Sequence, residues 1–258
     1  MTPTLTPVRR AGIRVLTDPG AAAFGVLVAW SDRIGGVSAP PFDTLNLAAM
    51  LGDDPAAVTR NRARVADAVG FELRALALSR QVHGAHVAEV GADDGGVVGE
   101  ADGLVTHWPG PVLGILSADC AAVAIVGERG VALVHAGWRG LAAGVVERGV
   151  ASVAPARAAW VGPCIRSCCY EVGPEVVAAF AARGLPVGRG RVDVSEAACR
   201  ALARAGVAAV AATPECTGCS PRYFSHRREG RTGRQGAFAC LLEGQAGGAT
   251  GEHTEHRR

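Results

Sequence analysis

Three side chains suited to binding a soft or borderline metal lie where apolar strands are expected to meet loops. His83 lies in the run QVHG, Cys120 in SADC and His135 in VHAGWRG. Two imidazoles and one thiolate form a sensible zinc set, which leaves the fourth tetrahedral position for water or substrate. The three are far apart in the chain, so the alternative of two strand-end histidines and one buried cysteine stays open at this point.

The same cysteine allows a second chemistry, in which Cys120 is a nucleophile and a neighbouring histidine is its base. Asp119, adjacent in sequence, is the candidate group to orient that pair. Because successive residues of a strand point to opposite faces, Asp119 is expected to serve in this way only where the chain bends.

A third cysteine pattern is the run CTGC, from Cys216 to Cys219. A single CxxC is a weak signal for a metal site. Cys164, Cys168 and Cys169 have no regular pair spacing that would complete such a site. The sequence therefore does not predict a second zinc ion.

The run LVHAGWRGLAAGVV, residues 133–146, combines apolar residues with three functional side chains. It is expected to be a strand that ends at His135, a glycine-flanked turn that carries Trp138 and Arg139, and a helix from about Leu141. An arginine in such a turn, close to a metal, suits an anionic substrate such as phosphate.

The composition indicates a globular protein with a substantial core. The chain has 258 residues, of which 49% are hydrophobic, and its formal net charge is +2. So small a charge gives no indication of nucleic-acid binding. The first residues lack the apolar core of a secretory signal, and the apolar run at 21–30 is too short to span a bilayer. A cytoplasmic protein without a membrane partner is expected, and its eight cysteines are expected to be thiols or metal ligands.

The elements that carry the candidate residues follow no regular alternation of strand and helix. The clearest helix begins after the N-cap residue Asp54, has Pro55 in its first turn and ends at Gly70. Several expected strands are apolar on both faces, which favours a mixed β-sheet core covered by helices. We expect a single catalytic domain over residues 1–243, of the α/β (layered α+β) class and not of the doubly wound nucleotide-binding type. The glycine-rich tail, 244–258, is expected to be disordered.

Taken together, the motifs resemble those of one family. In order along the chain, over roughly residues 35–238, they are GGVSAPPFDTLNLA, DDPAAVTRNRARV, RQVHG, ADGLVT, LSADCAAVAI, HAGWRGLAAGVVE, GPCIRSCCYEVGPEV and CTGCSPRYFSHRREGRTGRQ. The chain is similar to the laccase-domain or YfiH family, once called multicopper polyphenol oxidases. Ala122 and Tyr223 differ from residues that are common in the family, at positions peripheral to the candidate ligands.

The resemblance implies that His83, Cys120 and His135 are zinc ligands. It also implies a zinc-dependent purine nucleoside phosphorylase, which converts adenosine, inosine or methylthioadenosine and phosphate to free base and ribose 1-phosphate. An adenosine deaminase side activity belongs to the same implication. Zinc suits that hydrolysis because it lowers the pKa of bound water, but known zinc deaminases also use a glutamate proton shuttle. Asp119 and Glu171 are the candidate acids for that role.

Phosphorolysis requires a phosphate that is held beneath the ribose by arginine or backbone N–H groups. From their positions in the motifs, the expected anion and sugar contacts are Ser38, Asn46, Arg62 and Arg139. Trp138 is expected to pack beneath the site. The expected partners are a small-molecule nucleoside and phosphate, and nothing in the sequence assigns an oligomeric state.

Three other functions stay open. A cysteine hydrolase that edits amino-acid linkages in peptidoglycan precursors would use Cys120 and His135 as nucleophile and base. A copper polyphenol oxidase is less favoured, because two methionines and seven histidines are few for a multicopper protein; copper remains the alternative metal. A zinc-stabilised binding scaffold would close its metal site with a fourth protein ligand.

Overall fold

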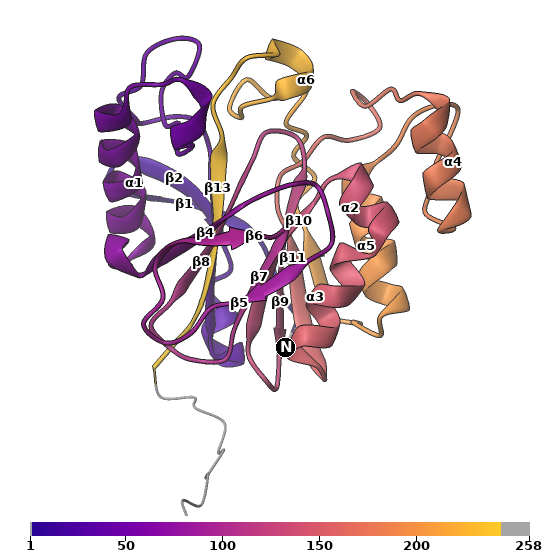
Figure 1. Cartoon of the computed structure of the whole chain (residues 1–258), viewed down its shortest axis with the longest axis horizontal. Helices are drawn as coiled ribbons and strands as arrows, with labels where there is room; N and C mark the ends of the chain where they lie inside the picture. The colour runs from indigo at the N-terminus through magenta and orange to yellow at the C-terminus, as the bar shows by residue number, and fades with distance from the viewer. Residues whose placement is uncertain (1, 244–258) are drawn as a thin grey trace, which may run out of the picture.

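Two β-sheets packed face to face form the centre of the protein in a computed structural model that describes residues 2–243 (Figure 1). In order across it, the first sheet consists of β1 (Thr6–Arg10), β2 (Ile13–Thr17), β3 (Val26–Ser31), β13 (Gln235–Leu241), β8 (Val112–Ser117), β4 (Leu76–Arg80) and β6 (Gly96–Glu100). The second consists of β12 (Val210–Ala212), β11 (Ala156–Val161), β9 (Ala121–Gly127), β10 (Val131–Ala136), β7 (Gly103–Thr106) and β5 (Val87–Glu89). Parallel and antiparallel pairs occur in both sheets, which confirms the expected mixed character.

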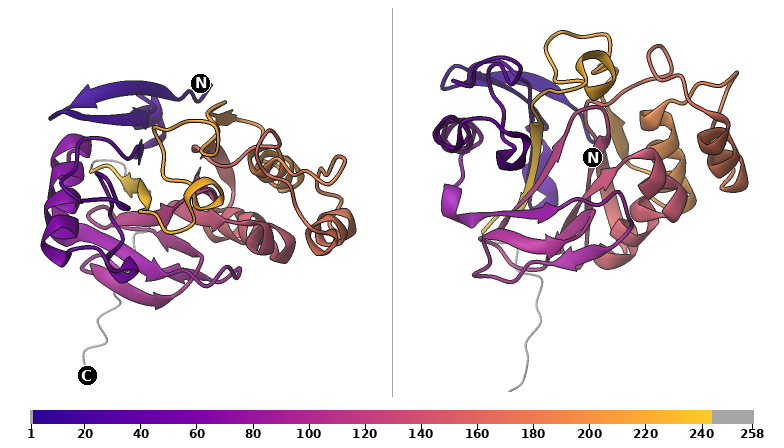
Figure 2. Two further views of the ribbon diagram at one scale, coloured as in Figure 1. Left: turned by 90° about the horizontal axis from the view of Figure 1, so that it is seen from above. Right: turned by 45° about the horizontal axis from the view of Figure 1, so that its top comes forward.

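Helices cover the outer face of each sheet, and Figure 1 shows them on opposite sides of the strands. The first sheet is covered by α1 (Pro55–Val69). On the side of the second sheet lie α2 (Trp138–Ala143), α3 (Val145–Val153), α4 (Pro174–Ala182) and α5 (Val194–Arg204). A single turn, α6 (His226–Glu229), lies at one end of the strands (Figure 2). Three short 3-10 turns complete the described elements: η1 (Ala21–Phe24), η2 (Ala49–Leu51) and η3 (Leu73–Ala75). The layered α/β class is confirmed.

Strand β9 shows why the central strands are apolar on both faces. Val123 and Ile125 point toward the helices of the second sheet. Ala124 and Val126, which alternate with them, point toward the first sheet. All seven residues of β9 are buried, because a strand in this layer has an apolar partner on each side.

The helix α1 forms as its sequence predicts. The side chain of Asp54 accepts a hydrogen bond from the backbone N–H of Ala56 at 2.9 Å, and Pro55 occupies the first turn, where no N–H is needed. Gly70, at φ 94°, ends the helix and donates to the carbonyl of Ala66. Capping at both ends therefore fixes a helix whose inner face packs on the first sheet.

The structure differs from the sequence prediction at the glycine-flanked turn. Trp138 and Arg139 lie in the first turn of α2 instead of preceding the helix. The predicted start near Leu141 is therefore wrong; the N-cap residue is Gly137, which has no side chain that would mark the start of the helix in the sequence. Gly144, at φ 83°, then separates α2 from α3. The short strands β1, β6 and β12 were also not predicted; each is an edge strand of its sheet.

Both ends of the described chain belong to the first sheet. β13 pairs with β3 on one side and with β8 on the other. The core shared by the two sheets agrees with a single domain. Among residues 2–243, no helix has the length and apolar character to cross a membrane. The disorder expected for 244–258 concerns a segment outside the described residues.

Candidate metal centre and cleft

The three predicted metal ligands come together in the structure. One ligand atom from each of His83, Cys120 and His135 lies within 4.8 Å of the other two. His135 is near the end of β10, where it pairs with Ala122 of β9, and Cys120 stands directly before β9. His83 comes from the loop that follows β4. Antiparallel pairing of two strands thus brings two of the ligands together, and a separate loop adds the third.

Because Gly137 has no side chain, it leaves space for Cys120 and His83 to approach each other. A Cβ atom at this position would lie 2.9 Å from Sγ of Cys120 and 3.4 Å from Cδ2 of His83. The first distance is shorter than real Cβ contacts allow, so a larger residue would displace the sulfur. The glycine of HAGWRG is therefore needed for close approach.

Asp102 fixes the two histidine-bearing segments with one buried carboxylate. Its Oδ1 lies 2.8 Å from Nδ1 of His135. The same carboxylate accepts hydrogen bonds from the backbone N–H groups of Val82, His83 and Gly84, at 3.1, 2.9 and 2.6 Å. Burial opposes ionisation of Asp102, but these hydrogen bonds outweigh it and lower its pKa. The hydrogen bond to Nδ1 leaves Nε2 of His135 for the ligand position.

The thiol and imidazole of the centre stabilise each other in their charged forms. Burial opposes ionisation of Cys120, but the charge and hydrogen bond of His135, with a hydrogen bond from His83, lower its pKa to about 6. Burial also opposes protonation of His135, but Cys120 and Asp102 raise its pKa to about 9. A thiolate near neutral pH is the form that binds a metal. This donor set, backed by Asp102, fits a zinc ion.

Two residues of the site adopt a left-handed backbone conformation that side chains rarely take. His83 has φ 61° and Asp119 has φ 96°. Such conformations cost on the order of 1–3 kcal/mol and are typical of functional sites. The chain therefore bends at Asp119, which is the condition under which the sequence analysis expected its side chain to reach the site.

Asp119 does not contact His135, so its predicted role as the group that orients the Cys–His pair is wrong; Asp102 has that position. Asp119 Oδ1 accepts from the hydroxyl of Thr217 at 2.6 Å, and Oδ2 accepts from the backbone N–H of Arg227 at 2.7 Å. The Asp119 carboxylate therefore holds the segment from Thr217 to Arg227 in place. Asp119 also lines the cleft into which the metal centre opens.

The metal centre opens into a cleft of about 770 Å³. Its wall includes the apolar residues Leu78, Leu116 and Trp138, and the aromatic residue Tyr170. Burial raises the pKa of Tyr170. A cleft of this size, with apolar walls and a few polar groups, is typical of small-molecule sites.

Five arginines line the cleft, against one carboxylate, that of Asp119: they are Arg62, Arg80, Arg139, Arg227 and Arg234. Among residues 2–243, all of them except Arg80 lack a salt bridge. Arg62 and Arg234 are half-buried, and this burial lowers their pKa. Such a wall attracts an anion.

The predicted substrate contacts divide into two groups. Arg62 and Arg139 line the cleft, where Arg62 Nε donates to the carbonyl of Leu47 at 2.8 Å and Arg139 stacks on Trp138, 4.2 Å from the ring centre. Ser38 and Asn46 lie outside the cleft wall, buried in a network around Asp53 and Asn61, so they have no direct contact with its interior.

Among the residues of the site that sequence reasoning missed are Asp102, Tyr170 and Arg234. The signals were present in the motifs, since Asp102 precedes the apolar strand of ADGLVT and Arg234 belongs to RTGRQ. Asn46 connects to this group indirectly, because its Oδ1 accepts the backbone N–H of Arg234 at 2.9 Å.

Comparison with known proteins gives consistent results over most of the chain. The family model described as multi-copper polyphenol oxidoreductase laccase matches residues 27–242. A Streptomyces coelicolor protein named purine nucleoside phosphorylase is 40% identical over 84% of this chain and 96% of its own length. The purine nucleoside phosphorylase YfiH of Escherichia coli is 37% identical over 84% and 95%. The crystal structure of YlmD from Geobacillus stearothermophilus superposes with a TM-score of 0.81 at 33% identity, over 89% of this chain and 96% of that one.

Proposed function

The chain belongs to the multi-copper polyphenol oxidoreductase laccase family, and we propose that it is a zinc-dependent purine nucleoside phosphorylase. Relatives at 37–40% identity bear the name purine nucleoside phosphorylase. The observation that carries the proposal is a cleft that joins a His–Cys–His metal centre to four arginines that have no carboxylate partner among residues 2–243. The proposal includes adenosine deaminase as a side activity. It also includes a cytoplasmic location, which the eight free cysteines favour.

His83, Cys120 and His135 would hold the metal. When bound, zinc would act as a Lewis acid that polarises an oxygen or nitrogen atom of the substrate. Asp102 orients His135 and the loop of His83, so the ligands need little rearrangement to bind. Copper is the alternative metal for the same donors.

Phosphate binds to the arginine side of the cleft. Arg62, Arg139 and Arg234 offer N–H groups that have no carboxylate partner in the described part of the chain, and a phosphate dianion would offset the cost of burying their charge. By holding phosphate close to the nucleoside, these groups make the attack on the ribose carbon effectively intramolecular. Their charge also stabilises the oxygens of phosphate throughout the transfer.

The apolar part of the cleft takes the nucleoside. Leu78, Leu116 and Tyr170 offer the surface on which a purine ring would be buried. Trp138 is engaged by the guanidinium of Arg139, so it supports that arginine instead of offering a free face to the base. Asn46 is a positioning residue, because its Oδ1 accepts hydrogen bonds from the backbone N–H groups of Arg234 and of Ala48, just before η2. Ser38 supports Asn46 indirectly, since both side chains donate to Asp53.

For the deaminase side activity, Asp119 is the acid of the cleft wall. Both its oxygens already accept hydrogen bonds, from Thr217 and from the backbone of Arg227. A proton shuttle there requires that one of these bonds opens. We therefore expect deamination to be slower than phosphorolysis.

A cysteine hydrolase is the second candidate, and one observation favours it. Cys120 contacts His135, and His135 contacts Asp102, so the three side chains are placed as a nucleophile, its base and the group that orients the base. The same atoms cannot serve both functions together, since a thiolate bound to a metal is a poor nucleophile. Oxidase activity is not part of the proposal: among residues 2–243, neither candidate metal group contains more than two histidines.

The direct test is incubation of the zinc-loaded protein with inosine, adenosine or methylthioadenosine and phosphate. Ribose 1-phosphate and free base are expected, in amounts that depend on phosphate. Release of alanine or another amino acid from a peptidoglycan precursor, without ribose 1-phosphate from any nucleoside, would favour the hydrolase instead.

A further inference from the structure

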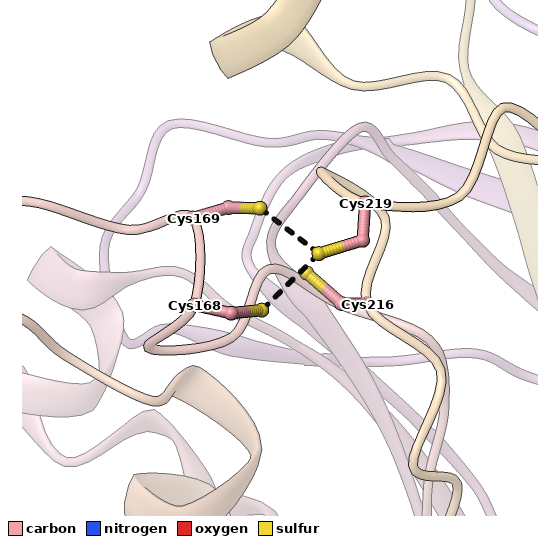
Figure 3. Close-up of side chains that lie close together, drawn as sticks. All are labelled: Cys168, Cys169, Cys216 and Cys219. Atoms are coloured by element: carbon pink, nitrogen blue, oxygen red, sulfur yellow. Dashed lines mark hydrogen bonds between the residues drawn. The ribbon is translucent and has the colours of Figure 1, made fainter.

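Four cysteines outside the cleft lie together although they come from two separate loops (Figure 3). Cys168 and Cys169 belong to the loop between β11 and α4, and Cys216 and Cys219 belong to the loop after β12. Their sulfur atoms all lie within 4.8 Å of one another. We propose that this group is a second metal site, which binds Zn²⁺ through four thiolates.

The sulfur positions are close to those of a tetrahedral zinc site. Sγ of Cys219 lies 3.3 Å from Sγ of Cys168 and 3.1 Å from Sγ of Cys169. With Zn–S bonds of about 2.3 Å, ligand sulfurs in a tetrahedron are about 3.8 Å apart. An outward shift of less than about 1 Å therefore accommodates the ion. Four soft sulfur donors in this geometry are typical of zinc.

The backbone of the CTGC run is shaped for this approach. A Cβ atom at Gly218 would lie 2.7 Å from Cβ of Cys169 and 3.0 Å from its Sγ, so only glycine allows the two loops to touch here. The N–H of Ser220 donates to the carbonyl of Cys216 at 3.0 Å, which closes a turn around the pair. Two cysteines separated by two residues on such a turn are a common half of a structural zinc site.

N–H and guanidinium groups lie close to the four cysteines. The backbone N–H of Arg166 donates to Sγ of Cys216 at 3.4 Å. Arg191 Nη1 donates to the carbonyl of Cys168 at 3.0 Å, and Arg228 Nη1 donates to the carbonyls of Thr217 and Gly218 at 2.7 and 3.1 Å. Zn²⁺ with four thiolates carries a net charge of −2. The guanidinium groups of Arg191 and Arg228, which also pair with Glu171 and Glu229, lie nearby and offset part of that charge.

The ion would connect two parts of the cleft wall. Tyr170, which lines the cleft, directly follows Cys169. Thr217, which lies between the other two ligands, donates to Asp119. A metal that joins the two loops therefore fixes the cleft wall from behind. Because Cys168 and Cys219 are exposed, the ion can enter from solvent.

Metal analysis of the purified chain tests the proposal independently of any enzyme activity. Wild-type protein loaded with zinc under reducing conditions and then desalted is expected to hold two zinc ions per chain. Cys219→Ser is expected to hold one, the ion of the His–Cys–His centre. Cys120→Ala is also expected to hold one, the ion of the four-cysteine site. Cys199→Ser, a half-buried cysteine of α5 outside both groups, is the matched control and keeps two.

Cobalt substitution distinguishes the two sites by their ligands. Co²⁺ bound to four thiolates gives strong visible absorption and sulfur-to-metal charge transfer, which we expect to persist in Cys120→Ala and to disappear in Cys219→Ser. If Cys219→Ser does not fold, Cys168→Ser, at an exposed position, replaces it.

Three outcomes would overturn the proposal. They are one zinc per wild-type chain with no loss in either variant of the four-cysteine group, disulfides among these four cysteines in protein kept under reducing conditions, or iron in place of zinc after loading with both metals. Failure of the phosphorylase assay would leave the two-zinc prediction unchanged.

Discussion

The carboxylate of Asp102 holds the imidazole of His135 at 2.8 Å and, with the same two oxygens, the backbone of the loop that carries His83. One fully buried residue thus positions two of the three metal ligands that are separated by 52 residues in the chain. These hydrogen bonds hold the ring orientation of His135 and the left-handed backbone of His83.

Asp102→Asn is expected to weaken zinc binding at the His–Cys–His centre by about 10-fold to 100-fold, the usual effect of losing a partner behind a metal ligand. The amide removes the negative charge and cannot accept as strongly from His135 and three N–H groups. Competition with a chelator measures the affinity. Asp67→Asn, an exposed residue on α1, is the control. Unchanged affinity in Asp102→Asn would contradict the positioning role.

Gly137→Ala is expected to lower zinc occupancy of the same centre while the fold persists. The added Cβ lies 2.9 Å from Sγ of Cys120, and the backbone of Gly137, at φ −78°, accepts alanine without strain. The effect is therefore steric and local. Gly188→Ala, where the new Cβ has no atom within 4 Å, provides the matched control. Equal zinc content in both variants argues against close packing as the reason for this glycine.

The three metal ligands could be predicted because each lies in a recognisable motif. That the three side chains come together depends on the pairing of strands, which no local sequence pattern indicates. The pairing of His135 with Ala122 follows from the register of β9 and β10. Alternation along β9 indicates a buried strand, yet it does not say that a second sheet covers one face. The division of the mixed core into two sheets was therefore not predictable from periodicity.

Residues that were assigned one role from their positions in the motifs can lie in different places in the fold. Ser38, Asn46 and Arg62 were assigned together as substrate contacts, but only Arg62 lines the cleft, since Asn46 and Ser38 are buried around Asp53. The four-cysteine group was not predicted from the sequence, for a related reason. Cys168 and Cys169 are adjacent in the chain, a spacing that does not resemble a usual ligand pair, and the loops meet only in the fold.

Arg62→Ala is expected to raise the KM for phosphate by about 10-fold to 100-fold, which corresponds to losing a charge-assisted hydrogen bond of about 1.5–3 kcal/mol. Arg62 lines the cleft, is partly buried and has no carboxylate partner among the described residues. Steady-state kinetics at varied phosphate checks this. Arg64→Ala, exposed two residues later on the same helix, is expected to leave the KM unchanged.

Zinc affinity of the His–Cys–His centre is expected to rise with pH by about tenfold per unit between about 6 and 9. In the metal-free protein the pKa of Cys120 is about 6 and that of His135 about 9. Within this window Cys120 is ionised and His135 still carries the proton that the metal must displace. Below it the slope becomes steeper, since Cys120 is also protonated. Chelator competition at several pH values measures the slope; a flat profile from 6 to 9 would contradict the assignment of His135 as a ligand.

Removal of the metal separates the two candidate functions of Cys120. If the phosphorylase proposal is right, chelation abolishes ribose 1-phosphate formation and readdition of zinc restores it. Alkylation of Cys120 by iodoacetamide is then slow in the zinc-loaded protein and fast after chelation, because its lowered pKa gives a thiolate near neutral pH once the metal is gone. Mass spectrometry of the labelled peptide identifies the site. Cys240, whose pKa burial raises to about 11, is expected to react slowly in both states. Fast alkylation of Cys120 in protein with a full complement of zinc would instead indicate a free nucleophile and favour the cysteine hydrolase.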